Sequence, residues 1–364
     1  MRIFVLATDA FGGYGGIALY NRDVLGALCS DSRVTEVVAV ARWRSQPMEA
    51  LPEKLDYRLG GVQSWVAYTL EVFRCGMRGN FDAIICCHIH LVPLAWLLGR
   101  LIRVPIILQI YGLEAWQPTS RMLTNFLVRK VDVIVSISKY TLERFKHWSG
   151  VPENRCTLLP NAVHLDEYDP TVSGERFRRQ FGLSGRKVLL TFGRLVSKER
   201  AKGFDEVLEI LRDLLEEDQD IRYVIAGDGP DRERLQLKVE KLGLSAIVHF
   251  AGMVDEREKN ELYCAADLFV MPSRGEGFGF VFLEALACGL PSIGSTVDGS
   301  REALIEGEIG TLVDPGDPEA LKAAIRHGLT LSKSVPAGLS YFSYPKFVER
   351  LWVTLSVMLS LEDR

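Results

Sequence analysis

The feature that most constrains the fold of this chain is an alternation of short Val/Ile-rich segments with longer helical patterns. From end to end, this alternation is typical of parallel sheets covered by helices, so we predict an α/β protein. In the first half, strands are expected at residues 3–7, 37–41, 83–87, 105–110, 133–136 and 156–159. In the second half, strands are expected at residues 188–192, 223–226, 248–250, 268–271, 292–294 and 310–313.

The chain is long enough for two domains. Its 364 residues exceed one ordinary hydrophobic core. A polar stretch near residues 165–185 has turn residues and charge but little apolar periodicity, so we place the connection there. The predicted domains are residues 1–170 and 171–344, followed by an amphipathic helix within residues 345–364.

Composition excludes several classes of protein. With 48% apolar residues, 25% charged residues and a net charge of −4, the chain is neither disordered nor an evident nucleic-acid binder. Its 7 cysteines are scattered without a CxxC pair, which indicates reduced, mostly buried thiols in a cytoplasmic protein. The first residues read as a strand and a glycine loop rather than a signal peptide, and no apolar run is long enough to span a membrane.

A glycine-rich loop leads directly into a helical pattern in the second half. Gly275, Gly277 and Gly279 precede a helix expected at residues 280–288. Glycines before a helix let backbone N–H groups approach a phosphate, and the helix N-terminus adds its partial positive charge. The loop therefore predicts a phosphate-binding site, although a helix start without a ligand has the same pattern.

Two carboxylates bracket this loop. Glu276 lies within it, and Glu284 lies just over one turn into the helix. Because a phosphate repels a carboxylate, we expect these acids to accept hydrogen bonds from sugar hydroxyls on either side of it. A nucleotide sugar has such hydroxyls, with a diphosphate between its two sugars. The alternative is a favourable acidic residue near a helix N-terminus.

Two other strand–helix junctions in this half are expected at the same sheet edge, where ligands bind in such folds. Arg194 follows a strand and a glycine, and Lys202 precedes a glycine at a helix start. Two cations at these positions suit a diphosphate, because arginine offers a bidentate contact and lysine a point charge. A lysine at a helix N-terminus is otherwise unfavourable, which favours a binding role for Lys202. The second junction begins at Gly227, and it could equally be a tight turn with an N-cap.

The first half holds a glycine loop of its own, at residues 12–16, ahead of a helix expected at 17–28. Its spacing is not that of a dinucleotide fingerprint, and no acid follows the second strand, so a Rossmann dehydrogenase is disfavoured. Two aromatic-basic stretches, SWVAYTLEVFRCGMR and TSRMLTNFLVRK, could rest on an anionic membrane surface. The alternative for both is an amphipathic helix that faces the sheet.

Several motifs occur together in one order. They are G-R-L-V…K-G, A-G-D-G-P, F-x-G-x-V at residues 250–254, and P-S-R-x-E-G-F-G-x-x-x-x-E-A-L-A-x-G-x-P. In this order and spacing the chain resembles retaining glycosyltransferases of the GT-B fold, family 4 type, which include enzymes of bacterial exopolysaccharide, capsule and lipopolysaccharide assembly. The resemblance is specific over residues 188–314 and weaker in the first half. It implies two Rossmann-like, doubly wound domains that face each other across a cleft.

The resemblance also implies roles for individual residues. Arg194 and Lys202 would neutralise the donor diphosphate, Glu284 would bind the ribose, and Glu276 would bind the transferred sugar. The remaining donor-binding positions implied are Gly13, Gly15, Gly16, Tyr111, Gly227, Val254, Phe278, Gly279 and Phe280. The base would lie against residues 252–254, and the final helix would pack back on the first domain. No metal or other cofactor is implied, because two cations and a helix N-terminus stand in its place.

One position departs from the pattern of the family. Tyr111 occupies a place where many relatives have a histidine in the donor pocket. Tyrosine can donate a hydrogen bond but cannot carry the same charge near neutral pH. His88 and His90, at a strand exit, could compensate, or they could be ordinary polar residues at that exit.

The sequence therefore predicts transfer of a hexose from a GDP- or UDP-sugar to an acceptor hydroxyl, with retention and without a metal. The expected acceptor is a saccharide or lipid-linked saccharide at the cytoplasmic face of a membrane. Peripheral contact with the anionic surface of that membrane is among the expected interactions. No nucleic acid is expected as a partner. The alternatives are a nucleotide-sugar epimerase or phosphorylase on the same architecture, and a non-catalytic subunit that binds the nucleotide sugar.

Overall fold

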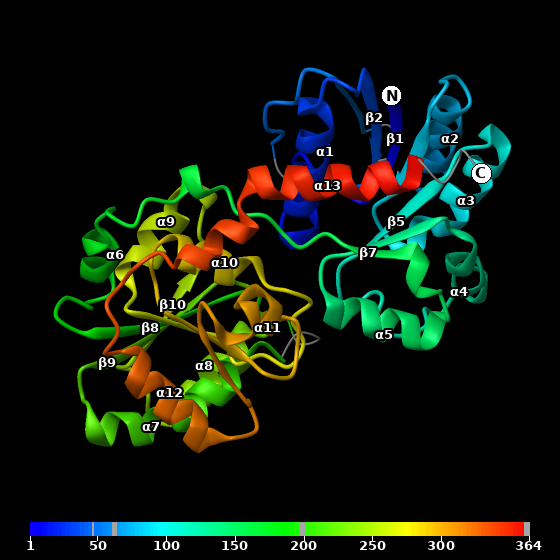
Figure 1. Cartoon of the computed structure of the whole chain (residues 1–364). Coiled ribbons are helices and arrows are strands. Elements are labelled where there is room, and N and C mark those ends of the chain that lie inside the picture. The colour runs from blue at the N-terminus through cyan, green and yellow to red at the C-terminus, as the bar shows by residue number, and fades with distance from the viewer. Residues whose placement is uncertain (46, 60–63, 197–200, 360–364) are drawn as a thin grey trace. The chain divides into compact units, whose positions relative to one another are not determined.

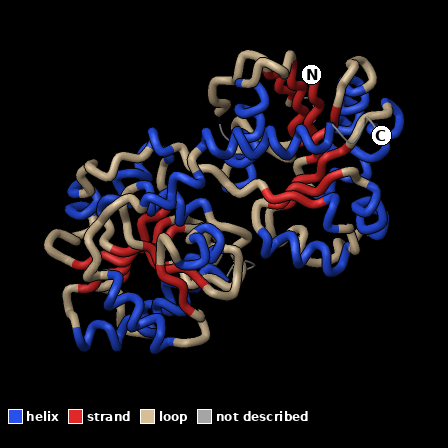
Figure 2. The backbone as a smooth tube through the Cα atoms, in the orientation of Figure 1, coloured by secondary structure: helices blue, strands red, loops and turns tan. Residues whose placement is uncertain are grey.

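The structure is a computed structural model that describes residues 1–45, 47–59, 64–196 and 201–359. It divides into two compact units. Unit 1 is Met1–Ala162 with Tyr344–Arg364, and unit 2 is Val163–Ser343. Each unit contains one parallel sheet surrounded by helices, as Figures 1 and 2 show. The predicted α/β class with two Rossmann-like sheets is confirmed.

Unit 1 has a seven-stranded sheet in the order β3-β2-β1-β4-β5-β6-β7. Its strands are β1 (Arg2–Ala7), β2 (Glu36–Ala41), β3 (Leu55–Arg58), β4 (Ala83–Cys86), β5 (Ile106–Ile110), β6 (Val133–Ser136) and β7 (Cys156–Leu158). Its α-helices are α1 (Gly16–Ser30), α2 (Trp65–Gly76), α3 (Val92–Ile102), α4 (Met122–Leu127), α5 (Lys139–Ser149) and α13 (Tyr344–Leu359). The sequence missed β3, a short strand at the edge of the sheet that pairs with β2 and lacks an apolar run.

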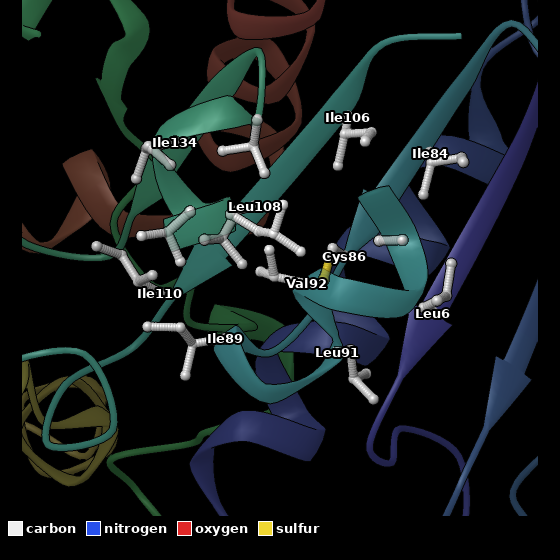
Figure 3. Close-up of a cluster of buried hydrophobic side chains, with 14 of the residues drawn as sticks. Leu6, Ile84, Cys86, Ile89, Leu91, Val92, Ile106, Leu108, Ile110 and Ile134 are labelled. Atoms are coloured by element: carbon white, nitrogen blue, oxygen red, sulfur yellow. The ribbon is translucent and has the colours of Figure 1, made fainter. Parts of the chain in front are cut away.

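The central strands of unit 1 form because their side chains are apolar on both faces. Every residue of β4, β5 and β6 is buried, as expected for a parallel sheet covered on both sides. Figure 3 shows part of the resulting core, with side chains from several strands packed against the segment that leads into α3. Its labelled residues are Leu6, Ile84, Cys86, Ile89, Leu91, Val92, Ile106, Leu108, Ile110 and Ile134.

The C-terminal helix α13 belongs to unit 1, where it lies beside α1 (Figure 1). The rings of Tyr20 and Phe347 meet edge to face at 5.6 Å, and the Arg33 guanidinium lies 4.0 Å from the ring centre of Trp352. The helix thus completes the core of the first unit, although it follows the last strand of the second.

Unit 2 has a six-stranded sheet in the order β10-β9-β8-β11-β12-β13. Its strands are β8 (Lys187–Phe192), β9 (Ile221–Ala226), β10 (Val248–Gly252), β11 (Leu268–Val270), β12 (Ser292–Ser295) and β13 (Thr311–Val313). Its α-helices are α6 (Glu175–Gln180), α7 (Phe204–Glu217), α8 (Arg232–Lys241), α9 (Glu256–Ala265), α10 (Phe280–Ala287), α11 (Ser300–Ala303) and α12 (Pro318–Gly328). Strand order reverses on either side of β8, and ligands bind at the carboxyl ends of the strands at such a point.

All seven cysteines are free, and most are buried. Among the residues that the structure describes, no helix combines the length and the apolar character that crossing a membrane requires.

Candidate active site

The loops after β8 and β9 pack directly on each other. Gly227 has a φ of 111°, and a Cβ there would lie 2.0 Å from the carbonyl oxygen of Gly193. The amide of Gly193 donates to the carbonyl of Ala226 at 3.0 Å, and the amide of Gly227 donates to that of Gly252 at 2.8 Å. Gly227 is therefore required by the close approach of two backbones, whether or not a ligand binds there.

The loop after β11 joins the same edge. Gly203 has a φ of 86°, and a Cβ there would lie 2.7 Å from Cδ of Pro272. The amide of Arg274 also donates to the carbonyl of Ala201 at 2.5 Å. The three junctions that the sequence assigned to one sheet edge therefore meet there. The intervening residues 197–200 lie outside the described part of the chain.

Lys202 and Glu276 form an ion pair at this meeting point. Nζ of Lys202 lies 2.8 Å from Oε2 of Glu276, and the side chains are 18% and 17% exposed. A Cβ on Gly193 would lie 3.0 Å from Cδ of Lys202, so the lysine side chain passes over the residue next to Arg194. Arg194 itself is exposed. Lys202 and Glu276, which the sequence predicted for the diphosphate and the transferred sugar, are thus in direct contact.

Asp298, which the sequence analysis missed, holds the glycine-rich loop in place. Its Oδ2 accepts from the hydroxyl of Ser273 at 2.6 Å and from the amide of Glu276 at 2.8 Å. Its Oδ1 accepts from the hydroxyl and the amide of Ser300 at 2.6 and 3.0 Å. Burial raises the pKa of Asp298, while these hydrogen bonds oppose the rise. The available signal was an acid three residues after the end of a strand, β12, at the same sheet edge.

The first turn of α10 follows this loop. Gly279 is its N-cap with a φ of 99°, and no side chain caps the helix. The ring of Phe278 is buried against Phe342, with ring centres 5.4 Å apart. Of Phe278, only the backbone can therefore face a ligand, and Phe280 begins the helix itself. The Val254 side chain is likewise buried.

Glu284 is buried in unit 2 with two polar partners that the sequence analysis did not identify. Its Oε1 accepts from Nζ of Lys259 at 3.1 Å, and its Oε2 accepts from the hydroxyl of Tyr263 at 2.7 Å. Burial alone would lower the pKa of Lys259, but the charges of Glu284 and Glu256 outweigh it and raise that pKa. A carboxylate has about four lone-pair sites, so Glu284 retains the capacity to accept further hydrogen bonds.

In unit 1, the predicted glycine loop leads into α1. Gly15 is the N-cap with a φ of 92°, and Gly16 is the first helical residue. A Cβ on Gly13 would lie 2.8 Å from Cβ of Ala18, whereas one on Gly15 would meet nothing within 4 Å. The loop thus needs glycine at residue 13 for packing and at residue 15 for backbone conformation.

The Tyr111 side chain lies in the interior of unit 1. Its hydroxyl lies 2.8 Å from Oδ1 of Asn21 and 3.0 Å from Oε1 of Gln109. Burial raises its pKa, and its amide donates to Oε1 of Glu114 at 2.6 Å. The phenol is therefore surrounded by protein groups, so the geometry offers its hydroxyl no contact with a donor.

The two histidines near Tyr111 in the sequence lie together. Nδ1 of His88 accepts from the amide of His90 at 3.2 Å, and their rings are 5.0 Å apart. Burial, with smaller effects of His90 and Arg42, lowers the pKa of His88 to about 4, so this imidazole is neutral near pH 7. Within the described residues, no group of three or more His, Cys, Asp or Glu side chains is arranged to hold a metal ion.

Comparison with known proteins assigns the class. The family described as Glycosyltransferase Family 4 matches residues 14–167, and Glycosyl transferases group 1 matches residues 173–335. Among solved structures, the chain is similar to Anabaena HepE in complex with UDP-glucose, with a TM-score of 0.78 and 20% identity over 98% of this chain and 100% of that one. These matches define a glycosyltransferase of the GT-B fold. The chain belongs to the family 4 type of these enzymes.

Curated relatives within this class act on different substrates. The chain is 33% identical over 216 residues to the GDP-mannose-dependent alpha-(1-6)-phosphatidylinositol monomannoside mannosyltransferase of Mycolicibacterium smegmatis, a match of 57% of this chain and 56% of that protein. It is 31% identical over 252 residues to the D-inositol 3-phosphate glycosyltransferase of Geodermatophilus obscurus, a match that covers 65% of this chain and 55% of that protein. The chain thus matches little more than half the length of either relative.

Proposed function

We propose that the protein transfers a hexose from a nucleotide diphosphate sugar, a GDP- or UDP-sugar, to an acceptor hydroxyl with retention of configuration. The observation that carries this proposal is the Lys202–Glu276 ion pair at the edge where the loops after β8, β9 and β11 meet. It brings a cation, a sugar-binding acid and a helix N-terminus into one place. Names of relatives support both bases, because they include a GDP-mannose-dependent enzyme and a structure with UDP-glucose.

In the proposed mechanism, the bond between the anomeric carbon and the donor phosphate breaks as the acceptor oxygen attacks from the same face. The departing phosphate takes the proton of the acceptor hydroxyl. Lys202, Arg194 and the amides at the start of α10 stabilise the growing negative charge. Glu276 and Glu284 accept hydrogen bonds from sugar hydroxyls and orient the donor. No metal takes part in this proposal.

The experiment that tests this function measures donor binding and turnover in one protein. Unfolding temperature is recorded with GDP, UDP and their hexose derivatives, because a ligand of the folded state raises it by mass action. Release of the nucleoside diphosphate is then measured for the wild type and for Glu276→Ala. We expect turnover to fall at least a hundredfold in Glu276→Ala, and unchanged turnover would contradict its role. Glu308→Ala, an exposed acid of the same unit, is the control.

A non-catalytic binding subunit remains the second candidate, because the Tyr111 side chain is buried where many relatives have a histidine in the donor pocket. Such a protein would bind the nucleotide sugar but release no nucleoside diphosphate with any acceptor. An epimerase is distinguished by a changed sugar after incubation with donor alone, and a phosphorylase by its need for orthophosphate.

We also propose that unit 1 rests on an anionic membrane surface through α3 and α4, which are in contact. Their exposed apolar side chains are Leu97, Leu101, Met122, Leu123 and Phe126. Residues 92–103 and 121–130 contain basic residues and no acid. Exposed apolar groups beside basic ones favour binding at an anionic interface. Replacing Leu123 and Phe126 by Glu should abolish cosedimentation with phosphatidylglycerol vesicles, and retained binding would contradict the proposal.

A further inference from the structure

Two arginines of unit 1 share one tryptophan. Cζ of Arg42, the residue after β2, lies 3.7 Å from the ring centre of Trp65 and 4.6 Å from that of Trp43. Cζ of Arg121, in the segment between β5 and α4, lies 5.8 Å from the same Trp65 ring. We call Arg42 and Arg121 the arginine pair. Stacking on an indole fixes a guanidinium plane while leaving its N–H groups at the edge able to bind an anion.

Within the described residues, the arginine pair lacks the carboxylate partners that several other arginines of this unit have. Arg2, Arg58 and Arg74 each form an ion pair with a nearby carboxylate. Across the described residues, neither member of the arginine pair forms such an ion pair, and Nε of Arg42 is buried without a hydrogen-bond partner. Burial and the charge of Arg121 lower the pKa of Arg42. An anion bound beside both guanidinium groups would offset the repulsion between them and give Nε of Arg42 a hydrogen-bond partner.

His88 and His90 follow β4, at the same edge of the sheet where Arg42 follows β2. His88 is the N-cap of the 3-10 turn Ile89–Leu91 after β4, and His90 lies within that turn. Nδ1 of His90 is buried with no partner among the described residues. After burial, the charge of Arg121 is the next cause that lowers the pKa of His90, and Arg42 acts in the same way on His88. A neutral His88 that accepts at Nδ1 carries its proton on Nε2, where it can donate to a ligand.

The place in the fold also favours a ligand. β2 and β4 flank β1, and the strand order of the sheet reverses between β1 and β4. His88 therefore follows a strand at the reversal point, and Arg42 follows the strand on the other side of β1, at the sheet edge where open α/β sheets bind their ligands. None of these residues belongs to the donor site proposed in unit 2.

We propose that the arginine pair, with His88 and His90, binds a phosphate ester of the acceptor. This inference rests on the proposed glycosyl transfer and specifies the acceptor as a phosphorylated alcohol, either soluble or a lipid headgroup. A phosphate matches two guanidinium groups because it offers several oxygens for paired, charge-assisted hydrogen bonds and carries up to two negative charges.

The test uses the full chain and two probes. Binding of D-inositol 3-phosphate is followed by calorimetry, with unphosphorylated inositol as its partner probe. Binding of phosphatidylcholine vesicles with and without phosphatidylinositol is followed by cosedimentation. Arg42→Gln and Arg121→Gln are compared with Arg144→Gln, whose guanidinium also stacks on a tryptophan, at 4.8 Å from the Trp116 ring. Unfolding temperatures establish that each variant is folded.

Arg42→Gln and Arg121→Gln should each weaken binding of at least one phosphate probe about tenfold, because each removes one charge-assisted hydrogen bond. Arg144→Gln should leave the binding of both probes unchanged. A response to the soluble probe identifies a free phosphate ester, and a response to the vesicles alone identifies a headgroup. Absence of binding to both probes, equal binding of inositol, or binding unaffected in folded Arg42→Gln and Arg121→Gln would overturn the inference. Titrations with GDP and UDP test the proposed donor site separately. If neither nucleotide binds, the proposed function is contradicted, while binding of the phosphate probes would still support the phosphate site.

Discussion

Removal of the Asp298 carboxylate is the sharpest perturbation of the candidate site, because this buried group touches no proposed substrate. It accepts four hydrogen bonds, from Ser273, from the amide of Glu276 and twice from Ser300. In Asp298→Ala, the Glu276 amide and the Ser300 amide lose their acceptor, at a cost of about 1–3 kcal/mol each where water cannot replace it. The serine hydroxyls can rotate and lose less. We therefore expect a loss of about 3–5 kcal/mol of unfolding free energy.

Scanning calorimetry measures this loss. In a unit of this size, about 4 kcal/mol corresponds to a decrease of roughly 10 °C in unfolding temperature. Asp298→Asn keeps one carbonyl oxygen but turns an amide toward backbone donors, so it should fall between Ala and the wild type. Asp314→Asn is the control, because Asp314 also accepts from a backbone amide, that of Gly316 at 2.7 Å, but is exposed.

The functional readout is binding of a nucleoside diphosphate below the lowered unfolding temperature. Since Asp298 fixes the amide of Glu276, its loss should free the Lys202–Glu276 ion pair from its position and weaken binding about tenfold or more. An unfolding temperature and an affinity equal to those of the wild type would refute the claim that Asp298 organises the loop. So would an equal effect of Asp314→Asn.

Three further predictions concern stability. Gly227→Ala should lower the free energy of unfolding by about 3 kcal/mol, because the new Cβ would lie 2.0 Å from a carbonyl oxygen. Gly185→Ala is the control: its φ is 73° and a Cβ there would meet no atom within 4 Å, so it should lose about 1 kcal/mol. Denaturant titration measures both values. The pKa of His88 is about 4 in the folded state, below its value of about 6.5 in the unfolded chain. Neutral His88 therefore contributes up to about 3 kcal/mol to the free energy of unfolding above pH 6.5, and this contribution is lost as the pH falls toward 4. Unfolding of His88→Gln should show a smaller loss over that range, and an identical pH profile would contradict this. Lys259→Met leaves Glu284 buried without its counter-charge and should lower the free energy of unfolding, measured by thermal unfolding, by about 3–5 kcal/mol. A loss of less than about 1 kcal/mol would contradict this prediction.

Local patterns alone determined the architecture of this protein. Runs of Val and Ile predicted every strand except β3, whose residues lack such a run. The same reasoning located the three junctions of unit 2, because carboxyl ends of parallel strands share one edge of a sheet. A strand buried on both faces is apolar whatever its neighbours are, so this information is present in each segment separately.

Tertiary structure decided which polar groups meet. The partners of Asp298 include residues on another junction, and Lys259 reaches Glu284 from a different helix. Tyr111 reads as a pocket residue in its motif, yet folding places its hydroxyl against Asn21. Hydrogen bonds and ion pairs act over a few ångströms between side chains distant in sequence. Periodicity predicts which face of an element is buried, but only the packed chain determines which charges face each other there.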